Sequence, residues 1–231
     1  MRSILARIPR MQLVIANKNY SSWSMRPWVL LREAGIAFEE VQLKFGDRGP
    51  AKGVERYSPT GKVPVLVIDG EPVWDSLAIC ETIAERHPEK QLWPADARAR
   101  RVARSICAEV HSGFPALRSA MPMNIRSRHP GKGLTPESRR DIERVVQLWT
   151  VCRTQHGAGG PLLFGRFTIA DAYYAPVVTR FQTYGVSLPP AAQAYCDAVL
   201  GLRAVREWMD AARRETEFVA DDEPYAAGHR Q

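Results

Sequence analysis

The sequence predicts a protein of two parts, a mixed α/β domain followed by an all-helical domain. Strand and helix signals alternate over residues 11–90, whereas only helical periodicities occur from Ala97 onward. A short proline-containing stretch, 91–96, separates the two patterns. We therefore expect domains at 11–90 and 97–231 joined by a linker, which suits a chain of 231 residues.

The first half of the α/β domain is predicted to contain a strand, a helix and a second strand. Met11–Ala16 is a short apolar run, typical of a strand buried on both faces. After a polar turn, a helix should begin at Pro27 and end before Gly35, because Pro favours the first helical turn and Gly the position after the last. Phe38–Phe45 alternates apolar and charged residues, which indicates a half-buried strand.

The second half of this domain is predicted to be a hairpin followed by a helix. Val63–Ile68 is rich in β-branched residues, and Asp69–Gly70 is a typical hairpin turn into a short strand at 72–74. An apolar helical pattern runs from Ser76 to about His87. The order βαβ, a less regular stretch and then ββα matches a thioredoxin-like domain of about 80 residues.

Composition limits the classes of function. Hydrophobic residues make up 45% and charged residues 25%, as in ordinary globular proteins, and no apolar run approaches the ~18 residues of a membrane helix. The net charge of +7 comes from scattered basic residues without interleaved aromatic residues, which favours solvated helix faces over nucleic-acid binding. Residues 1–10 lack the apolar stretch of a signal peptide and are interpreted as an extension, so we expect a cytoplasmic location.

The four cysteines do not show a catalytic or metal-binding pattern. They are far apart, form no Cys-x-x-Cys pair and are not near a His at ligand spacing, so we expect neither a redox dithiol nor a metal site. Cys80 and Cys107 lie among apolar residues at helical spacing and are predicted to be buried thiols. The second domain shows roughly five helical segments interrupted by Pro and Gly.

Three short motifs contain candidate binding or catalytic residues. Ser21 and Ser22 precede the first helix, where free N–H groups and the helix dipole favour a negative charge such as a thiolate. Pro64 opens a strand after Val63, and a cis bond here would turn the Val63 backbone outward to pair with an extended peptide. Asp75–Ser76 starts another helix, where Ser can bind a carboxylate and Asp an ammonium group.

Each motif alone has a simpler explanation, since Ser and Asp before helices are common N-caps and only ~5% of X-Pro bonds are cis. Together, two helix starts and a Val-Pro edge outline a site for a γ-glutamyl tripeptide. With these motifs the chain resembles serine-type, bacterial members of the glutathione S-transferase superfamily from Met11 onward. Ser21–Arg26 matches the active-site motif of that family, Lys62–Leu66 its cis-proline motif and Asp75–Ser76 its acid-serine motif. Phe167–Ala172 resembles the N-capping box of its helical domain.

The resemblance implies a role for each matched residue. Ser21 would hold the glutathione sulfur as a thiolate, with its neighbour Ser22 as the alternative. The Val63 backbone would pair with the cysteinyl unit, and Pro64 would keep that backbone open. Asp75–Ser76 would hold the γ-glutamyl end.

A basic residue should meet the glycyl carboxylate of glutathione, and Lys62 and Lys44 are the candidates. The pocket for the second substrate should be lined by the first long helix of the helical domain. We expect that helix over Glu109–Met121, with His111 and Phe114 on one face. The same apolar stripe also fits a core-facing position.

The expected activity is that of a glutathione transferase, in which glutathione thiolate, as co-substrate, attacks a small electrophile without a metal. The Ser-Ser-x-Ser run also resembles the zeta class, which includes maleylacetoacetate isomerases, although that class usually has Cys where this chain has Trp23. Glutathione-dependent cis–trans isomerisation is therefore one alternative, and Arg126 is a candidate contact for an acidic substrate. A non-catalytic binding module is another alternative. The resemblance further implies a homodimer, with neither nucleic acid nor a membrane as partner.

Overall fold

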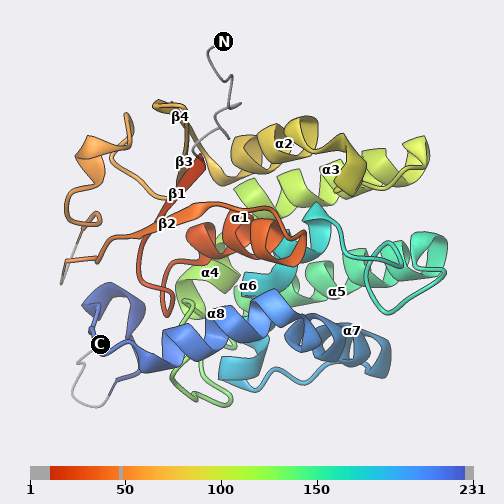
Figure 1. The fold of residues 1–231 in the computed structure, drawn as a ribbon. Helices are drawn as coiled ribbons and strands as arrows, with labels where there is room; N and C mark the ends of the chain where they lie inside the picture. Colours follow the sequence, from red (N-terminus) through yellow and green to blue (C-terminus); the bar gives the residue numbers. More distant parts are fainter. Residues whose placement is uncertain (1–10, 47–48, 227–231) are drawn as a thin grey trace, which may run out of the picture.

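The computed structural model describes residues 11–46 and 49–226, which form an α/β domain packed against a helical domain (Figure 1). The predicted extension at 1–10 lies outside the described residues, as does 227–231. The elements of the α/β domain are β1 (Met11–Ile15), α1 (Ser22–Glu33), β2 (Glu39–Gln42), the short helix η1 (Val54–Arg56), β3 (Val65–Ile68), β4 (Glu71–Val73) and α2 (Ser76–Arg86).

The strands of the described chain form one sheet in the order β2-β1-β3-β4. Strand β1 is parallel to β2, to which α1 connects it, and antiparallel to β3. The β3-β4 hairpin turns at Asp69 and Gly70, whose φ angles of 51° and 94° are both positive, as an Asp-Gly turn of this kind requires. This topology confirms the predicted βαβ-ββα order and the thioredoxin-like fold.

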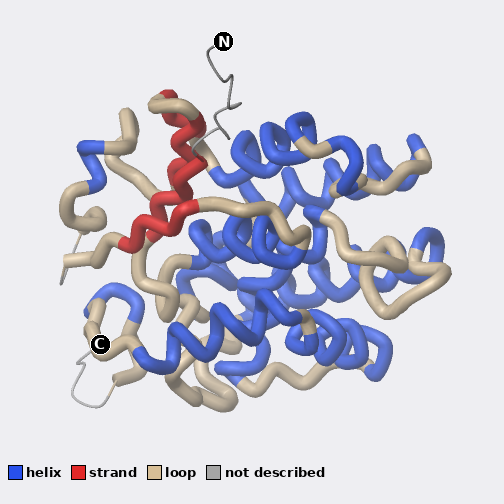
Figure 2. The backbone as a smooth tube through the Cα atoms, viewed as in Figure 1, coloured by secondary structure: helices blue, strands red, loops and turns tan. Residues whose placement is uncertain are grey.

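The helical domain has six α-helices within the described residues, whereas the sequence pattern indicates about five. In Figure 2 the strands gather at one side of the molecule and the helices fill the rest. The helices are α3 (Ala97–Ser112), α4 (Pro115–Ala120), α5 (Pro136–His156), α6 (Ile169–Tyr184), α7 (Pro190–Gly201) and α8 (Arg203–Arg214), followed by the short helix η3 (Ala220–Asp222).

Helix α1 begins earlier than predicted, at Ser22 rather than at Pro27. The side chain of Ser21 caps it by accepting a hydrogen bond from the Ser24 N–H at 3.4 Å, so the hydrogen-bonded turn starts before the proline. Pro27 then lies inside the helix, where it removes a single backbone hydrogen bond. Gly35, with φ of 67°, follows the helix end as expected.

The single helix expected over Glu109–Met121 is wrong, because α3 ends at Ser112 and α4 begins at Pro115. Pro115 has no N–H to continue the helical ladder, and Phe114 before it adopts a left-handed conformation with φ of 59°. His111 and Phe114 therefore do not share one helical face.

Helix α6 is the central helix of the molecule, buried along its length except at Gln182 and packed against α1 and α3. The predicted capping box between Thr168 and Asp171 is present at its amino end. The fully buried Asp171 carboxylate accepts hydrogen bonds from the Thr168 N–H at 2.9 Å and the Leu163 N–H at 3.1 Å. It also accepts one from the Tyr195 hydroxyl at 3.3 Å, which links α6 to α7.

All four cysteines are free and buried, which confirms the prediction for Cys80 and Cys107. Burial raises the pKa of the Cys107 thiol well above its ordinary value, so this thiol stays protonated and unreactive. No helix in the ranges 11–46 and 49–226 is long and apolar enough to cross a membrane.

Replacing Asp171 with Ala should destabilise the protein strongly. The variant leaves the Thr168 and Leu163 N–H groups and the Tyr195 hydroxyl buried without their acceptor. Since each unsatisfied buried group costs ~1–3 kcal/mol, we expect the free energy of unfolding to fall by about 3 kcal/mol or more, measured by urea denaturation. Asp197→Ala, at an exposed position on α7, is the control and should change it by less than about 0.5 kcal/mol. Equal effects of the two variants would contradict this role.

Candidate functional site

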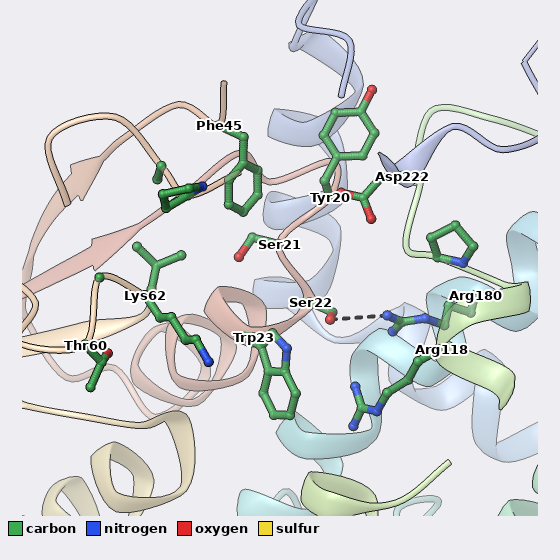
Figure 3. Close-up of a pocket in the computed structure, with 15 residues that line it drawn as sticks. Tyr20, Ser21, Ser22, Trp23, Phe45, Thr60, Lys62, Arg118, Arg180 and Asp222 are labelled. Carbon is green, nitrogen blue, oxygen red and sulfur yellow. Dashed lines mark hydrogen bonds between the residues drawn. The ribbon is translucent and has the colours of Figure 1, made fainter. Parts of the chain in front are cut away.

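Two adjoining cavities lie where the α/β domain meets the helical domain. Their volumes are about 680 Å³ and about 520 Å³, and they share the residues Trp23, Thr60, Lys62 and Val63. One elongated ligand can therefore extend through both. The walls of the first cavity, shown in Figure 3, also include Ser21, Ser22, Arg118, Arg180 and Asp222. Those of the second also include Pro64, Asp75, Ser76 and His111.

Ser21 and Ser22 lie side by side in the first cavity at the amino terminus of α1. The Ser21 hydroxyl donates to the Ser24 hydroxyl at 2.7 Å, whereas the Ser22 hydroxyl accepts from the Arg180 guanidinium at 3.2 Å. Figure 3 shows that the Ser21 hydroxyl points toward the side of the cavity formed by Lys62, and that of Ser22 toward Arg180. Both buried hydroxyls thus meet the cavity from a helix start that favours negative charge.

The second cavity brings together the residues predicted to bind glutathione: Lys62, Val63, Pro64, Asp75 and Ser76. The peptide bond between Val63 and Pro64 is cis, a geometry that the sequence motif alone did not establish. Lys62 and Val63 also border the first cavity, so these two residues connect the peptide edge to the serines. The three motifs, far apart in sequence, therefore meet at one continuous site.

A chain of hydrogen bonds connects Asp75 and Ser76 to the helical domain. The imidazole of His111 lies with Nε2 at 3.2 Å from the Asp75 carboxylate and Nδ1 at 3.3 Å from the Tyr173 hydroxyl. That hydroxyl is also 2.9 Å from the Ser76 hydroxyl. Because a carboxylate only accepts, a neutral imidazole donates from Nε2 to Asp75 and accepts at Nδ1 from Tyr173.

The structure places His111 in the second cavity, beside Asp75, and not in the first. Burial lowers the pKa of His111 below its ordinary value, and the carboxylate of Asp75 opposes this effect only in part. Phe114 is buried and lines neither of these two cavities. Both residues were candidates for the second-substrate pocket from the sequence, and the break between α3 and α4 separates them.

The first cavity contains two cations that sequence reasoning missed, Arg118 on α4 and Arg180 on α6. The buried Arg180 donates to the carbonyls of Met121 (2.8 Å) and Pro176 (3.1 Å) as well as to Ser22. None of the ion pairs between described residues includes either arginine. Burial and the nearby arginines lower the pKa of Arg180 to about 9. An anionic ligand would relieve this excess of positive charge.

The indole of Trp23 lines both cavities and lies close to two guanidinium groups. Arg26 lies 4.1 Å and Arg118 4.6 Å from the centre of the ring, distances typical of cation–π contacts. Arg26 is fully buried, donates from Nε to the Tyr173 carbonyl at 3.3 Å, and has its pKa lowered to about 10 by burial. Trp23 is thus a fixed wall of the site.

The segment after α8 secures the loop that carries the serines. The Glu215 carboxylate accepts the backbone N–H of Lys18 at 2.8 Å and that of Asn19 at 3.0 Å. Arg126 donates to the carbonyls of Glu215 and Glu217, so it holds this segment and is not among the residues lining the first cavity. No sequence motif marks these contacts, because they join residues that lie 89 to 197 positions apart.

Of the two lysines proposed for the glycyl carboxylate, only Lys62 lines the cavities. Lys44 forms an ion pair with Glu217 at 2.9 Å, which lowers the pKa of that carboxyl. Across residues 11–46 and 49–226, no group of three or more His, Cys, Asp or Glu side chains is arranged to hold a metal ion.

Comparison with protein families agrees with this arrangement. The family model for the glutathione S-transferase N-terminal domain matches residues 20–86, and that for the glutathione S-transferase C-terminal domain matches residues 134–211. The chain belongs to the glutathione S-transferase family. The first match spans all three motifs, and the second spans the capping box and Arg180.

Curated relatives in this family include isomerases. The maleylacetoacetate isomerase of Mus musculus is 33% identical, over 74% of this chain and 78% of the relative, and a probable maleylacetoacetate isomerase of Caenorhabditis elegans is 28% identical over 73% and 78%. These zeta-class relatives support the resemblance to that class.

Solved structures of glutathione transferases share the fold. A homologue from Burkholderia gl BGR1 with bound glutathione superposes with a TM-score of 0.68 at 22% identity, covering 89% of this chain and 100% of its own. The tau-class enzyme of mango, Mangifera indica, gives a TM-score of 0.66 at 19% identity, over 88% and 96%.

Changing Glu215 to Gln should loosen the serine loop. Each carboxylate oxygen accepts one backbone N–H, whereas Gln would turn an NH₂ group toward one of them. We expect a loss of ~1–3 kcal/mol in unfolding free energy together with lower kcat/KM in a glutathione-dependent assay. Glu207→Gln, which alters an exposed ion pair with Arg32, is the matched control and should leave both quantities nearly unchanged. If Glu215→Gln kept the wild-type unfolding free energy and kcat/KM, the role of Glu215 in holding the serine loop would be refuted.

Proposed function

We propose that this chain is a glutathione transferase that promotes attack of the glutathione thiolate on small electrophilic molecules. The observation that carries the proposal is the convergence of the serine, Val-Pro and Asp-Ser motifs on two connected cavities between the domains. The total volume is adequate for a tripeptide and a small second substrate, and family membership supports glutathione as the co-substrate.

In this proposal the residues of the chain bind, orient and ionise the thiol. Asp75 and Ser76 hold the γ-glutamyl end, the Val63 backbone pairs with the cysteinyl unit, and Lys62 meets the glycyl carboxylate. Ser21, whose hydroxyl points toward the Lys62 side of the first cavity, turns its proton from the Ser24 hydroxyl to the sulfur when glutathione binds, and stabilises the thiolate with the α1 dipole. Catalysis then comes from orientation and a lowered thiol pKa, without a covalent enzyme intermediate.

Replacing Ser21 with Ala should raise the pKa of the bound thiol. A hydrogen bond to a charged group is worth ~1.5–3 kcal/mol, which corresponds to about one to two pKa units. We expect thiolate absorbance and kcat/KM to shift toward higher pH by that amount, with lower turnover at neutral pH.

Ser22→Ala is the matched variant for this test, because its hydroxyl also lines the first cavity but contacts Arg180. A shift confined to Ser22→Ala would transfer the sulfur contact to Ser22. No shift in either variant would refute a serine-stabilised thiolate.

A second candidate function is glutathione-dependent cis–trans isomerisation of an acidic substrate. Two observations favour it: Arg118 and Arg180 bring unpaired positive charge to the first cavity, and several curated relatives are named maleylacetoacetate isomerase. In that reaction the thiolate adds to a double bond, the resulting single bond rotates, and the thiolate leaves, so glutathione is not consumed. Consumption of glutathione therefore distinguishes the two activities.

If the isomerase activity is present, Arg118→Gln should raise KM for a maleyl-type dicarboxylate by about tenfold or more, since an ionic hydrogen bond is worth ~1.5–3 kcal/mol. Arg139→Gln, at an exposed position of α5, removes the same charge outside the cavity and is the control. Equal effects of both variants would show that only overall charge matters.

A non-catalytic binding module would neither be retained on immobilised glutathione nor increase the rate with chlorodinitrobenzene, a generic aryl halide. We also propose, from family membership, a cytoplasmic homodimer in which the α/β domain of one subunit packs on the helical domain of the other. Analytical ultracentrifugation would measure this state.

A further inference from the structure

A carboxylate near the carboxyl end of the chain faces the first cavity. Asp222, the last residue of η3, lines this cavity together with Ser21, Ser22 and Arg180. In Figure 3 its side chain lies between Tyr20 and Arg180, on the cavity wall. No hydrogen bond or ion pair joins this side chain to another residue of the described chain, so its oxygens remain available to a ligand.

The residues around Asp222 are firmly attached to the rest of the protein. Glu223 accepts a hydrogen bond from the Tyr20 hydroxyl at 2.7 Å and lies 3.8 Å from the guanidinium of Arg126. The Tyr225 hydroxyl donates to the Ala120 carbonyl at 2.7 Å, which fixes the other side of the turn. Neighbouring residues therefore hold Asp222 at the cavity. Its own carboxylate is not used for this anchoring.

The environment of Asp222 suits a group that gains and loses a proton near neutral pH. Burial raises the pKa of its carboxyl to about 6, and the positive charge of Arg180 opposes this increase. General acids and bases work best with pKa values near the working pH. The titratable and charged groups around the cavity and η3 are Arg180 and Tyr184 on α6, Arg118 on α4, Lys62 before β3, Tyr20 before α1, and Asp221 and Glu223 in the same segment.

We infer that Asp222 accepts the proton of the glutathione thiol and returns it to the electrophile in addition reactions, a role that rests on the proposed function. In the opening of an epoxide, the S–H proton moves to the Asp222 carboxylate and an S–C bond forms. The C–O bond breaks, and the Asp222 carboxyl gives its proton to that oxygen. No further reactant is required.

Substitution on an aryl chloride differs at one step. There the S–C bond forms and chloride leaves with its electron pair, so the product receives no proton and Asp222 releases it to water. The epoxide reaction therefore needs the thiol and Asp222 to hold one proton between them, on either group. The aryl chloride reaction needs only the thiolate. The epoxide rate should fall at high pH, where both groups are ionised, while the aryl chloride rate should level off.

The test compares the isosteric variant Asp222→Asn with wild type, using styrene oxide and chlorodinitrobenzene as electrophiles. We expect the ratio of kcat/KM for styrene oxide to that for chlorodinitrobenzene to fall about tenfold or more, since proton transfer by a positioned group contributes ~10²–10⁴. The falling limb of the styrene oxide profile at high pH should disappear. Asp221→Asn, which changes the exposed neighbour, is the control and should keep the wild-type ratio.

The ratio is measured on one preparation, so a smaller folded fraction cancels. An unchanged ratio, or equal loss with both electrophiles, would overturn the proton-return role while leaving the proposed transferase function intact. If wild type converted chlorodinitrobenzene but not styrene oxide, the proton-return role would likewise be overturned and the transferase function would stand. Failure of wild type to bind glutathione or to convert either compound would overturn both proposals.

Discussion

The burial of the loop before α1 is the constraint on which the rest of the site depends. Every residue from 17 to 22 is buried, and buried backbone groups need hydrogen-bond partners. The far end of the chain supplies many of them: Trp208 donates to the Lys18 carbonyl at 2.9 Å, and Glu215 accepts the N–H groups of Lys18 and Asn19. The α/β domain carries the candidate serines, but the helical domain and the segment after it hold them in place.

The same packing determines the electrostatics of the first cavity. Arg180 is buried against carbonyl groups and the Ser22 hydroxyl, without a carboxylate at ion-pair distance in the described chain. Buried charges are costly unless paired, so this guanidinium, with Arg118 and the amino terminus of α1, makes the cavity favourable for an anion. A thiolate and an acidic substrate group would both benefit from that field.

Helix α6 connects the two cavities. It supplies Arg180 to the first and Tyr173, through the hydrogen bonds to Ser76 and His111, to the second. Its near-complete burial leaves these side chains little freedom, and the Asp171 capping box anchors its amino end. A substitution at the cap therefore acts on Tyr173, about half a helical turn away, and on Arg180, about two and a half turns away, through the position of the whole helix.

Local patterns of residues were enough to predict the Asp-Gly hairpin, the N-caps at the two helix starts, and the three motifs from which the family resemblance followed. These depend on neighbouring residues, so they are visible in one stretch of chain. Only the tertiary structure revealed Arg180, which contacts Ser22 across 158 positions, and Glu215, which contacts Lys18 across 197. It also revealed the break at Phe114, with His111 in the second cavity beside Asp75. These contacts form because distant segments pack together in the folded chain. A local pattern of residues cannot predict that packing.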